Sequence, residues 1–294
     1  MKPPEFAYVR PGSVKEAVAA LATNDDAKIL AGGQSLVPLM NFRLAAPSVL
    51  VDINRIPELS FVESMGGQLR LGAMTRTRAL ELDPLVRQSV PILAAAARWI
   101  GHVQIRNRGT VGGSLAHADP AAELPAICVL LGAELAVLGP RGERLIGSAD
   151  FFQGFLTTAL ADDELITEVR MPIPITGLGW GFHEFAHRRG DFALAGAAVT
   201  LPAESDGEAR IAVFGTADRA LRVTDAEDLL RAGDRSSASL DAVARLAGAT
   251  ILAEDPRPDA AFRRRLIETT VRRALDDAVI RASGGHPAGT RVAA

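Results

Sequence analysis

Two glycine pairs, each followed closely by a serine, are the residues of this chain best suited to bind a ligand. The first glycine loop is Ala31-Gly32-Gly33-Gln34-Ser35, and the second glycine loop is Thr110-Val111-Gly112-Gly113-Ser114. Where side chains are absent, backbone N–H groups can approach a phosphate closely, and successive N–H groups in such a turn form a concave anion nest. Two loops of this kind predict one large anionic ligand held twice, and a dinucleotide pyrophosphate fits that description.

Spacing excludes the other common phosphate and nucleophile motifs. A P-loop ends in Gly-Lys-Ser or Gly-Lys-Thr, which neither loop has, so hydrolysis of a nucleoside triphosphate is not expected. A Rossmann fingerprint needs Gly-x-Gly-x-x-Gly, and the adjacent glycines break that spacing. The sequence has no Gly-x-Ser-x-Gly motif for a serine nucleophile.

Metal chemistry is not expected in this chain. Its single cysteine, Cys128, excludes an internal disulfide and any cysteine-held zinc site or iron–sulfur cluster supplied by this chain alone. Cys128 lies in an apolar helical pattern and is interpreted as a buried structural thiol. His117 and Asp119 stand two residues apart, but no further ligand lies near them in the sequence, so no metal site is predicted.

Composition limits the class of protein. With 294 residues the chain exceeds the usual size of a single core, so two domains are expected. No apolar run reaches the roughly 18 residues of a membrane span. The net charge of −3 does not favour nucleic acid. The residues from Met1 to Phe6 lack the apolar core of a secretory signal, which predicts a cytoplasmic protein.

The patterns predict three structural parts followed by a tail. Residues 1–55 form a β-α-β unit, with a capping box at Ser13 and Glu16, strands at 28–31 and 49–53, and a helix at 36–44. Residues 56–176 contain a strand at 68–73, helices up to 80 and at 92–99, a long functional loop at 100–113, a helix starting at Asp119-Pro120, a hairpin at 133–146 and a strand at 166–171.

A run of proline and glycine places the domain boundary near residue 176. Beyond it, residues 177–282 form a C-terminal α+β domain, with strands at 182–186, 194–201 and 210–214 and helices at 226–231, 240–249 and 260–282. The tail 283–294 is predicted to be disordered.

Three motifs together resemble one family. They are the first glycine loop with Leu36, the run from Ile105 to Ser114, and the run from Ala116 to Glu123. This combination resembles the flavin-binding medium subunit of the molybdenum hydroxylases, a family that includes aerobic carbon monoxide dehydrogenase and relatives of the flavin domain of xanthine dehydrogenase. The resemblance covers nearly the whole chain. It implies an α+β protein of the vanillyl-alcohol-oxidase type, in which two α/β subdomains enclose FAD and a C-terminal α+β domain covers part of it.

The resemblance also implies which residues contact a non-covalently bound FAD. They are Lys28, Ile29, Leu30, Ala31, Gly32, Gly33, Gln34, Ser35, Leu36, Ile100, Thr110, Val111, Gly112, Gly113, Ser114, His117, Asp119, Glu123, Ile166, Glu184 and Phe192. Relatives often carry His, Lys and Tyr at the positions of Gln34, Glu184 and Phe192, so side-chain contacts from these three stay open. Asp119 has an alternative role as the N-cap of a helix that starts at Pro120.

The implied function is electron transfer, with no acid or base supplied by this chain. A small subunit with two [2Fe-2S] clusters and a large subunit with molybdopterin are the expected partners, in a dimer of heterotrimers. FAD here collects electrons from the clusters for an external acceptor. Two alternatives stay open, namely a self-sufficient FAD-dependent oxidase or reductase of the same fold, and a non-catalytic assembly subunit. The substrate and the acceptor do not follow from this chain.

Overall fold

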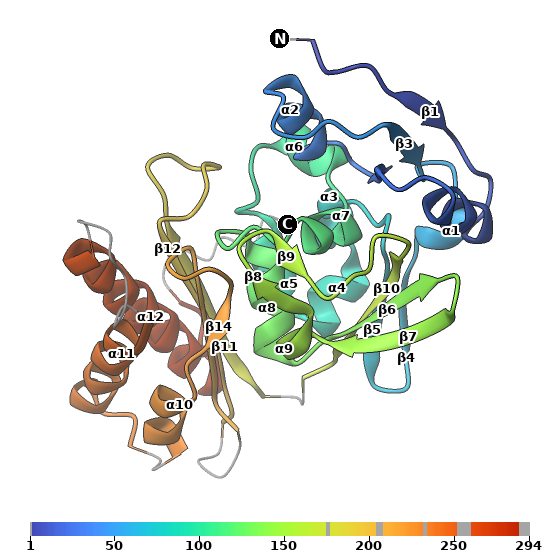
Figure 1. Ribbon diagram of the computed structural model, residues 1–294. Coiled ribbons are helices and arrows are strands. Elements are labelled where there is room, and N and C mark those ends of the chain that lie inside the picture. Colours follow the sequence, from blue (N-terminus) through green and yellow to red (C-terminus); the bar gives the residue numbers. More distant parts are fainter. Residues whose placement is uncertain (1, 175–176, 204–207, 232–233, 252–259, 288–294) are drawn as a thin grey trace. The chain divides into compact units, whose positions relative to one another are not determined.

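The chain divides into two compact units. The computed structural model describes residues 2–174, 177–203, 208–231, 234–251 and 260–287 (Figure 1). The first unit comprises Met1–Asp119 and Gly132–Ile173, and the second comprises Pro120–Leu131 and Pro174–Ala294. The predicted boundary at residue 176 lies outside the described residues, as does the predicted tail from residue 288 onward. Residues 120–131, which the sequence placed with 56–176, belong to the second unit.

The first unit begins with a parallel three-stranded sheet. Its strands are β1 (Ala7–Val9), β3 (Val49–Asp52) and β2 (Ala27–Leu30), in that order. Helix α1 (Val14–Ala22) starts at the predicted capping box, where the Ser13 hydroxyl accepts a hydrogen bond from the Glu16 N–H at 3.2 Å. Because parallel strands end at one edge, the chain leaving β2 into the first glycine loop and the chain leaving β3 emerge together. A short helix α2 (Leu36–Asn41) follows that loop.

An antiparallel five-stranded sheet completes the first unit. Its order is β4 (Val62–Met65), β5 (Gln68–Gly72), β10 (Leu165–Pro172), β6 (Glu134–Gly139) and β7 (Gly142–Gly147), so the predicted hairpin at 133–146 is confirmed. The short elements around it are a 3₁₀ turn at Pro57–Leu59, α3 (Thr77–Leu82), α4 (Pro84–Ser89), α5 (Pro91–Ala97), α9 (Ser148–Phe151), β8 (Phe152–Gly154) and β9 (Thr157–Thr158).

The prediction of a long loop at 100–113 is wrong. This segment contains helix α6 (Val103–Arg108) and the start of helix α7 (Val111–His117). No residue of α6 is buried, so it lacks the apolar period that predicts helices. Arg106 holds its start instead, donating to the carbonyls of Ile100 at 3.1 Å and Gly101 at 2.9 Å.

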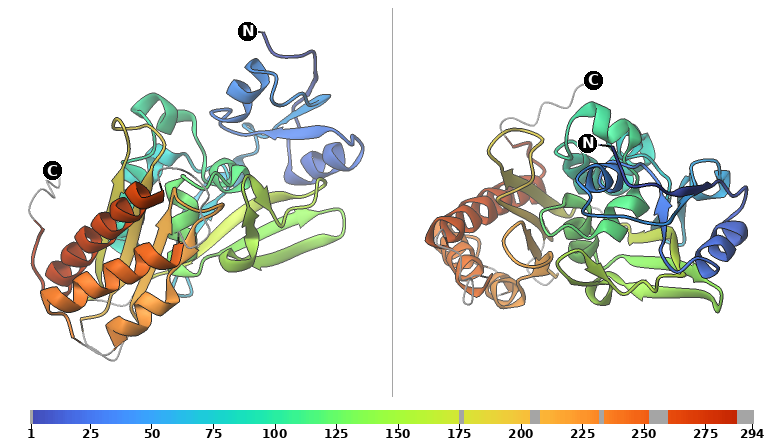
Figure 2. Two further views of the ribbon diagram at one scale, coloured as in Figure 1. Left: turned by 60° about the vertical axis from the view of Figure 1, so that its left-hand side comes forward. Right: turned by 45° about the horizontal axis from the view of Figure 1, so that its top comes forward.

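The second unit is a four-stranded antiparallel sheet with helices on both faces. Its strands are β11 (Gly179–Phe185), β12 (Ala195–Leu201), β13 (Arg210–Phe214) and β14 (Leu221–Arg222). Helices α10 (Thr224–Arg231), α11 (Ser237–Ile251) and α12 (Ala260–Ala282) follow, and the first two views agree that α11 and α12 run along one face of the sheet (Figures 1 and 2). The strands and helices predicted for this region are confirmed.

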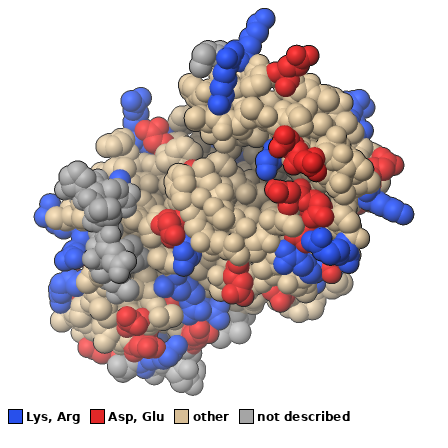
Figure 3. Space-filling view, in the orientation of Figure 1, with Lys and Arg blue, Asp and Glu red and all other residues tan. Residues whose placement is uncertain are grey.

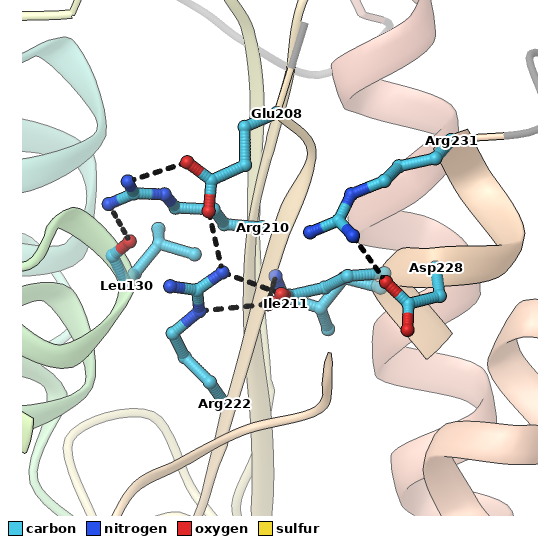
Figure 4. A network of polar contacts seen from close by, with 8 residues as sticks. Leu130, Glu208, Arg210, Ile211, Arg222, Asp228 and Arg231 are labelled. Carbon is cyan, nitrogen blue, oxygen red and sulfur yellow. Dashed lines mark hydrogen bonds and ion pairs between the residues drawn. The ribbon is translucent and has the colours of Figure 1, made fainter. Parts of the chain in front are cut away.

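Helix α8 (Glu123–Leu131) covers the other face of this sheet. Along β13, Ile211 and Val213 pack in the core that includes α12, so the alternate residue Arg210 points to the opposite side. There the Arg210 guanidinium donates to the Leu130 carbonyl of α8 at 3.3 Å (Figure 4). All residues of α8 are buried, including Cys128, whose interpretation as a buried thiol is confirmed.

Candidate functional site

The two glycine loops, far apart in the sequence, meet in the first unit. A Cβ atom built on Gly32 would overlap the carbonyl oxygen of Arg108 and would lie 2.9 Å from the Cα of Gly109. A Cβ on Gly113 would lie 3.5 Å from the Ala31 Cβ. Only glycine permits the approach of Gly32 to Arg108, because backbone atoms pack directly against backbone atoms there.

The first glycine loop presents free backbone donors. Gly33 has a left-handed φ of +72°, and the Val37 N–H donates to the Gly33 carbonyl at 3.2 Å, which closes the turn. Among the described residues, no protein acceptor pairs with the N–H groups of Gly33, Gln34 and Ser35. The Gln34 side chain folds back and donates to the Gly32 carbonyl at 3.2 Å. Consecutive unpaired N–H groups are the donor set of an anion nest.

The second glycine loop is held differently, because its amides have acceptors within the protein. The Val111 and Gly112 N–H groups donate to the carbonyls of Thr75 at 3.0 Å and Ala73 at 2.8 Å. The Gly113 N–H donates to the Thr110 hydroxyl at 3.1 Å, as in a helix N-cap. A Cβ on Gly112 would lie 2.7 Å from the Ala73 Cβ, so this loop is pressed against the chain that follows β5.

A polar cluster that sequence reasoning missed lies where the loops meet. Asn54 follows β3 and donates to the Ala31 carbonyl at 2.7 Å, while Arg76 donates to the Asn54 side-chain oxygen at 2.8 Å and to the Arg108 carbonyl. Asp52 accepts from the Asn54 N–H at 2.9 Å. The available signal was Asp-x-Asn at the carboxyl end of a buried strand that neighbours β2, the edge where parallel sheets bind ligands.

The other predicted residues of the first unit flank the loops or lie in the sheets. Lys28, Ile29 and Leu30 form most of β2, and the exposed Lys28 ammonium is 3.9 Å from the Asp162 carboxylate. Leu36 starts α2. Ile166 is buried on β10, opposite Val137 of β6, and Ile100 is half-buried beside Gly101.

His117 and Asp119 lie at the end of α7. Burial lowers the pKa of His117 below its ordinary value, although the Asp119 carboxylate acts in the opposite direction. Ala118 between them has a left-handed φ of +51°, which ends the helix. The next helix, α8, begins at Glu123 rather than at Asp119-Pro120 as the sequence suggested, because residues 120 and 121 form a turn.

Three predicted residues, Glu123, Glu184 and Phe192, belong to the second unit. The Glu184 side chain is buried on β11, and within the described residues neither carboxyl oxygen has a hydrogen-bond partner. Burial, reinforced by the Glu123 carboxylate, raises the pKa of Glu184 to about 9, against the opposite effect of Arg189. Glu184 is therefore a neutral carboxylic acid at pH 7. Phe192 is 68% exposed.

On the face drawn in Figure 3, basic and acidic side chains are interspersed. The described part of the chain contains no group of three or more His, Cys, Asp or Glu side chains placed to hold a metal ion. Within the same residues, no helix combines the length and apolar character that crossing a membrane requires.

Comparisons with known proteins match both units. Residues 4–174 match the family described as the FAD binding domain in molybdopterin dehydrogenase, and residues 180–278 match the CO dehydrogenase flavoprotein C-terminal domain. The chain is 43% identical to the 6-hydroxypseudooxynicotine dehydrogenase complex subunit alpha of Paenarthrobacter nicotinovorans, over 96% of this chain and 97% of that protein.

Solved structures give the same result. A chain of carbon monoxide dehydrogenase from Hydrogenophaga pseudoflava has a TM-score of 0.91 and 40% identity, over 96% of this chain and 99% of that one. A chain of quinoline 2-oxidoreductase from Pseudomonas putida 86 has a TM-score of 0.91 and 37% identity, over 98% and 100%.

The fold and the paired glycine loops thus define an FAD-binding flavoprotein of the α+β class, with the predicted C-terminal domain. The chain belongs to the family of FAD-binding medium subunits of the molybdenum hydroxylases. It is the flavoprotein component of a multi-subunit oxidoreductase, and its role is electron transfer rather than substrate oxidation.

Proposed function

We propose that the first unit binds one FAD non-covalently, with its pyrophosphate on the unpaired amides of the first glycine loop. The observation that carries this proposal is the backbone contact between Gly32 and Arg108, which puts the two loops at one place. The N–H groups of Gly33, Gln34 and Ser35 fit the phosphate oxygens chemically, because they are adjacent donors without acceptors among the described residues.

The second glycine loop has a complementary role in this proposal. Since its amides are paired to Ala73, Thr75 and Thr110, it contributes a rigid wall and the Ser114 hydroxyl rather than a second amide nest. Ile100 and Ile166 supply apolar surface to the ring or the adenine. His117, Asp119, Glu123, Glu184 and Phe192 are proposed flavin neighbours by family resemblance alone.

Bound FAD accepts electrons singly or in pairs, which suits a step between one-electron clusters and a final acceptor. The chain's own residues bind the cofactor, fix its orientation and set the charge around it. None of them is assigned a proton-transfer step. The names of the relatives support an electron-transfer role that does not depend on the substrate. They refer to 6-hydroxypseudooxynicotine, carbon monoxide and quinoline, although their chains are similarly close to this one.

We propose that the chain assembles with a small [2Fe-2S] subunit and a large molybdopterin subunit into a dimer of heterotrimers, and that an external acceptor reoxidises the flavin. The near-complete coverage of medium subunits in both directions supports this assembly over a self-sufficient oxidase and over a flavin-free assembly subunit.

The test is to purify the tagged full-length chain from cells that express its native partners and to measure its mass and cofactor content. We expect two copies of three different chains, with about four iron atoms and about one molybdenum atom for each FAD. A homo-oligomer that oxidises substrate with FAD alone would establish the oxidase alternative. A complete complex without flavin would establish the assembly alternative.

A further inference from the structure

Two side chains between the glycine loops have no role in the function proposed so far. We propose that Arg76 and Asn54 are positioning residues, which hold the two glycine loops in the arrangement that binds FAD. This inference rests on the proposed function. It adds a requirement to it, namely that the contact between the loops is maintained by side chains outside both of them.

The two side chains form a continuous bridge from one loop to the other. Asn54 Nδ2 donates to the carbonyl oxygens of Ala31 at 2.7 Å and Leu30 at 3.3 Å, where the first loop leaves β2. Asn54 Oδ1 accepts from Arg76 Nη2 at 2.8 Å. Arg76 Nη1 donates to the Arg108 carbonyl, just before the second loop.

Asp52 fixes the orientation of the Asn54 amide. Its carboxylate accepts from the Asn54 N–H at 2.9 Å and from Asn54 Nδ2 at 2.6 Å, and also from the Tyr8 hydroxyl. Burial by itself would raise the pKa of Asp52, but the hydrogen bonds from Tyr8 and Asn54 outweigh it and hold the pKa below its ordinary value. Because Nδ2 faces this carboxylate and the first loop, Oδ1 must face Arg76.

The bridge ends at the atom on which the loop contact depends. The Arg108 carbonyl that accepts from Arg76 is also the group that a Cβ on Gly32 would overlap. Arg76 therefore holds this carbonyl against Gly32. The backbone pairs Thr77 N–H to Gly109 O at 2.9 Å and Val111 N–H to Thr75 O at 3.0 Å do not involve either side chain, so the local fold has separate support.

A guanidinium could also act simply as a positive charge that attracts the pyrophosphate. The two roles differ in geometry, because the bridge uses two nitrogens of a planar guanidinium that point at two separated acceptors, whereas a Lys ammonium presents all of its donors from a single nitrogen. Arg76→Lys therefore keeps the charge and removes the bridge. Arg76→Met removes both.

The experiment is to titrate FAD into the deflavinated complex that contains the full-length chain, following flavin fluorescence, for Arg76→Lys, Arg76→Met, Asn54→Ala and the double variant Asn54→Ala/Arg76→Met. The matched control is Arg144→Met, because Arg144 likewise joins two acceptors, the Glu164 carboxylate and the Ala159 carbonyl, but it lies on β7, away from both glycine loops in the sequence. The melting temperature before FAD addition reports folding.

We expect Arg76→Lys, Arg76→Met and Asn54→Ala each to raise the Kd for FAD about tenfold or more, with Arg144→Met close to the wild type. The rise in Kd for the double variant should not exceed the product of the two single rises. It should be smaller than that product if the bridge acts as one unit. If Arg76→Met does not fold, Arg76→Lys and Asn54→Ala carry the same test.

If Arg76→Lys binds FAD with wild-type affinity and Arg76→Met binds it more weakly, the bridge is overturned and Arg76 acts through its positive charge. Wild-type affinity in Asn54→Ala, or an equal loss in Arg144→Met, would overturn it as well. A wild-type complex that binds no FAD would be a different result, since it would remove the proposed function itself.

Discussion

Gly33 and Gly66 share a left-handed backbone but differ in their surroundings. Gly33 has φ +72° in the first glycine loop, while Gly66 has φ +60° in the turn between β4 and β5, with no atom within 4 Å of its built Cβ. A valine is strained at either position, at a cost of about 1–3 kcal/mol. If the proposed site is right, only the first loop needs this conformation for its ligand.

We therefore predict that Gly33→Val abolishes FAD binding and that Gly66→Val does not, although both variants melt at lower temperature than the wild type. Gly112→Val should also lose FAD, because its side chain would collide with Ala73. The measurement is the ratio of flavin to protein in the purified complex. Stoichiometric flavin in Gly33→Val and Gly112→Val would contradict the two-loop site.

The raised pKa of Glu184 predicts that the stability of the folded chain depends on pH. Its pKa is raised from 4.5 to about 9, so between these values the folded chain keeps a proton that the unfolded chain has lost. Because the folded state then binds more protons, the free energy of unfolding falls as pH rises through this window. Glu184→Gln removes this dependence.

The check is the melting temperature of the purified chain at several pH values from about 5 to 9. The wild type should lose more stability than Glu184→Gln as the pH rises. Glu208→Gln is the control, because hydrogen bonds from Arg210 and Arg222 lower the pKa of Glu208 and its window lies at acid pH. Parallel curves for the wild type and Glu184→Gln would show that Glu184 is ionised in the fold.

The residues of the candidate site differ in how far the sequence alone could identify them. Adjacent glycines with serine could be identified because a ligand-binding backbone needs their lack of side chains. Asn54 was marked only by the short Asp-x-Asn signal after β3, and Arg76 was not marked at all, because the contacts of both side chains with the loops reach residues 22 or more positions away in the chain. The site's backbone was thus predictable, and its side-chain support was not.

At the scale of elements, helix α10 is joined to the sheet by one buried carboxylate. Glu227 is fully buried and accepts from the Ile211 N–H of β13 at 2.8 Å and from Arg222 of β14 at 2.6 and 3.0 Å (Figure 4). Its neighbour Asp228 pairs with Arg231 at 2.6 Å, but both of these side chains are more than half exposed.

We predict that Glu227→Ala destabilises the chain by about 3–5 kcal/mol, because it leaves a buried N–H and a partly buried guanidinium without their acceptor. Asp228→Ala should change stability by no more than about 0.5 kcal/mol, since exposed ion pairs contribute little. Urea unfolding of the two variants measures the difference. Similar losses in both would mean that the α10 contact does not depend on Glu227.

At this scale, the sequence predicted elements that bury apolar side chains and missed elements that do not. Helix α1 was predicted because its buried apolar residues repeat with the helical period, and strands β12 and β13 were predicted because each contains a short, mostly apolar run that is buried almost throughout. Helix α6 was missed because it buries nothing and is fixed by Arg106, which contacts carbonyls at its start and the Glu81 carboxylate at 3.1 Å. Strand β1 was missed because its three residues are exposed on one edge of the sheet.

At the scale of the whole chain, one segment of the second unit lies, in the sequence, between two segments of the first unit. Helix α8 is encoded inside the first unit's sequence, yet it covers the β12 and β13 face of the second unit, with Leu124, Ile127 and Leu130 buried. Periodicity could identify this helix, but it cannot tell which sheet a helix covers. The second unit is therefore incomplete without a segment that precedes it by more than 40 residues.

We predict that a fragment from Pro174 to Ala294 does not fold cooperatively, because the face that α8 covers would be exposed to water. Fusing residues 118–133 to it through a flexible linker should restore a cooperative melt and near-ultraviolet circular dichroism from Trp180. A fusion in which the apolar residues of α8 are replaced by polar ones is the control. A cooperative melt of the fragment alone would contradict the shared helix.

The same helix makes the chain a convenient host for spectroscopic labels. Cys128 is the only thiol in the sequence, it is fully buried in α8, and burial raises its pKa to about 12. Maleimides and nitroxide reagents react with exposed thiolates, so the native chain should stay unmodified at neutral pH. Met65→Cys, at an exposed position, would then supply the single labelled thiol, and a spin label there could measure its distance to a flavin radical without any prior removal of native cysteines.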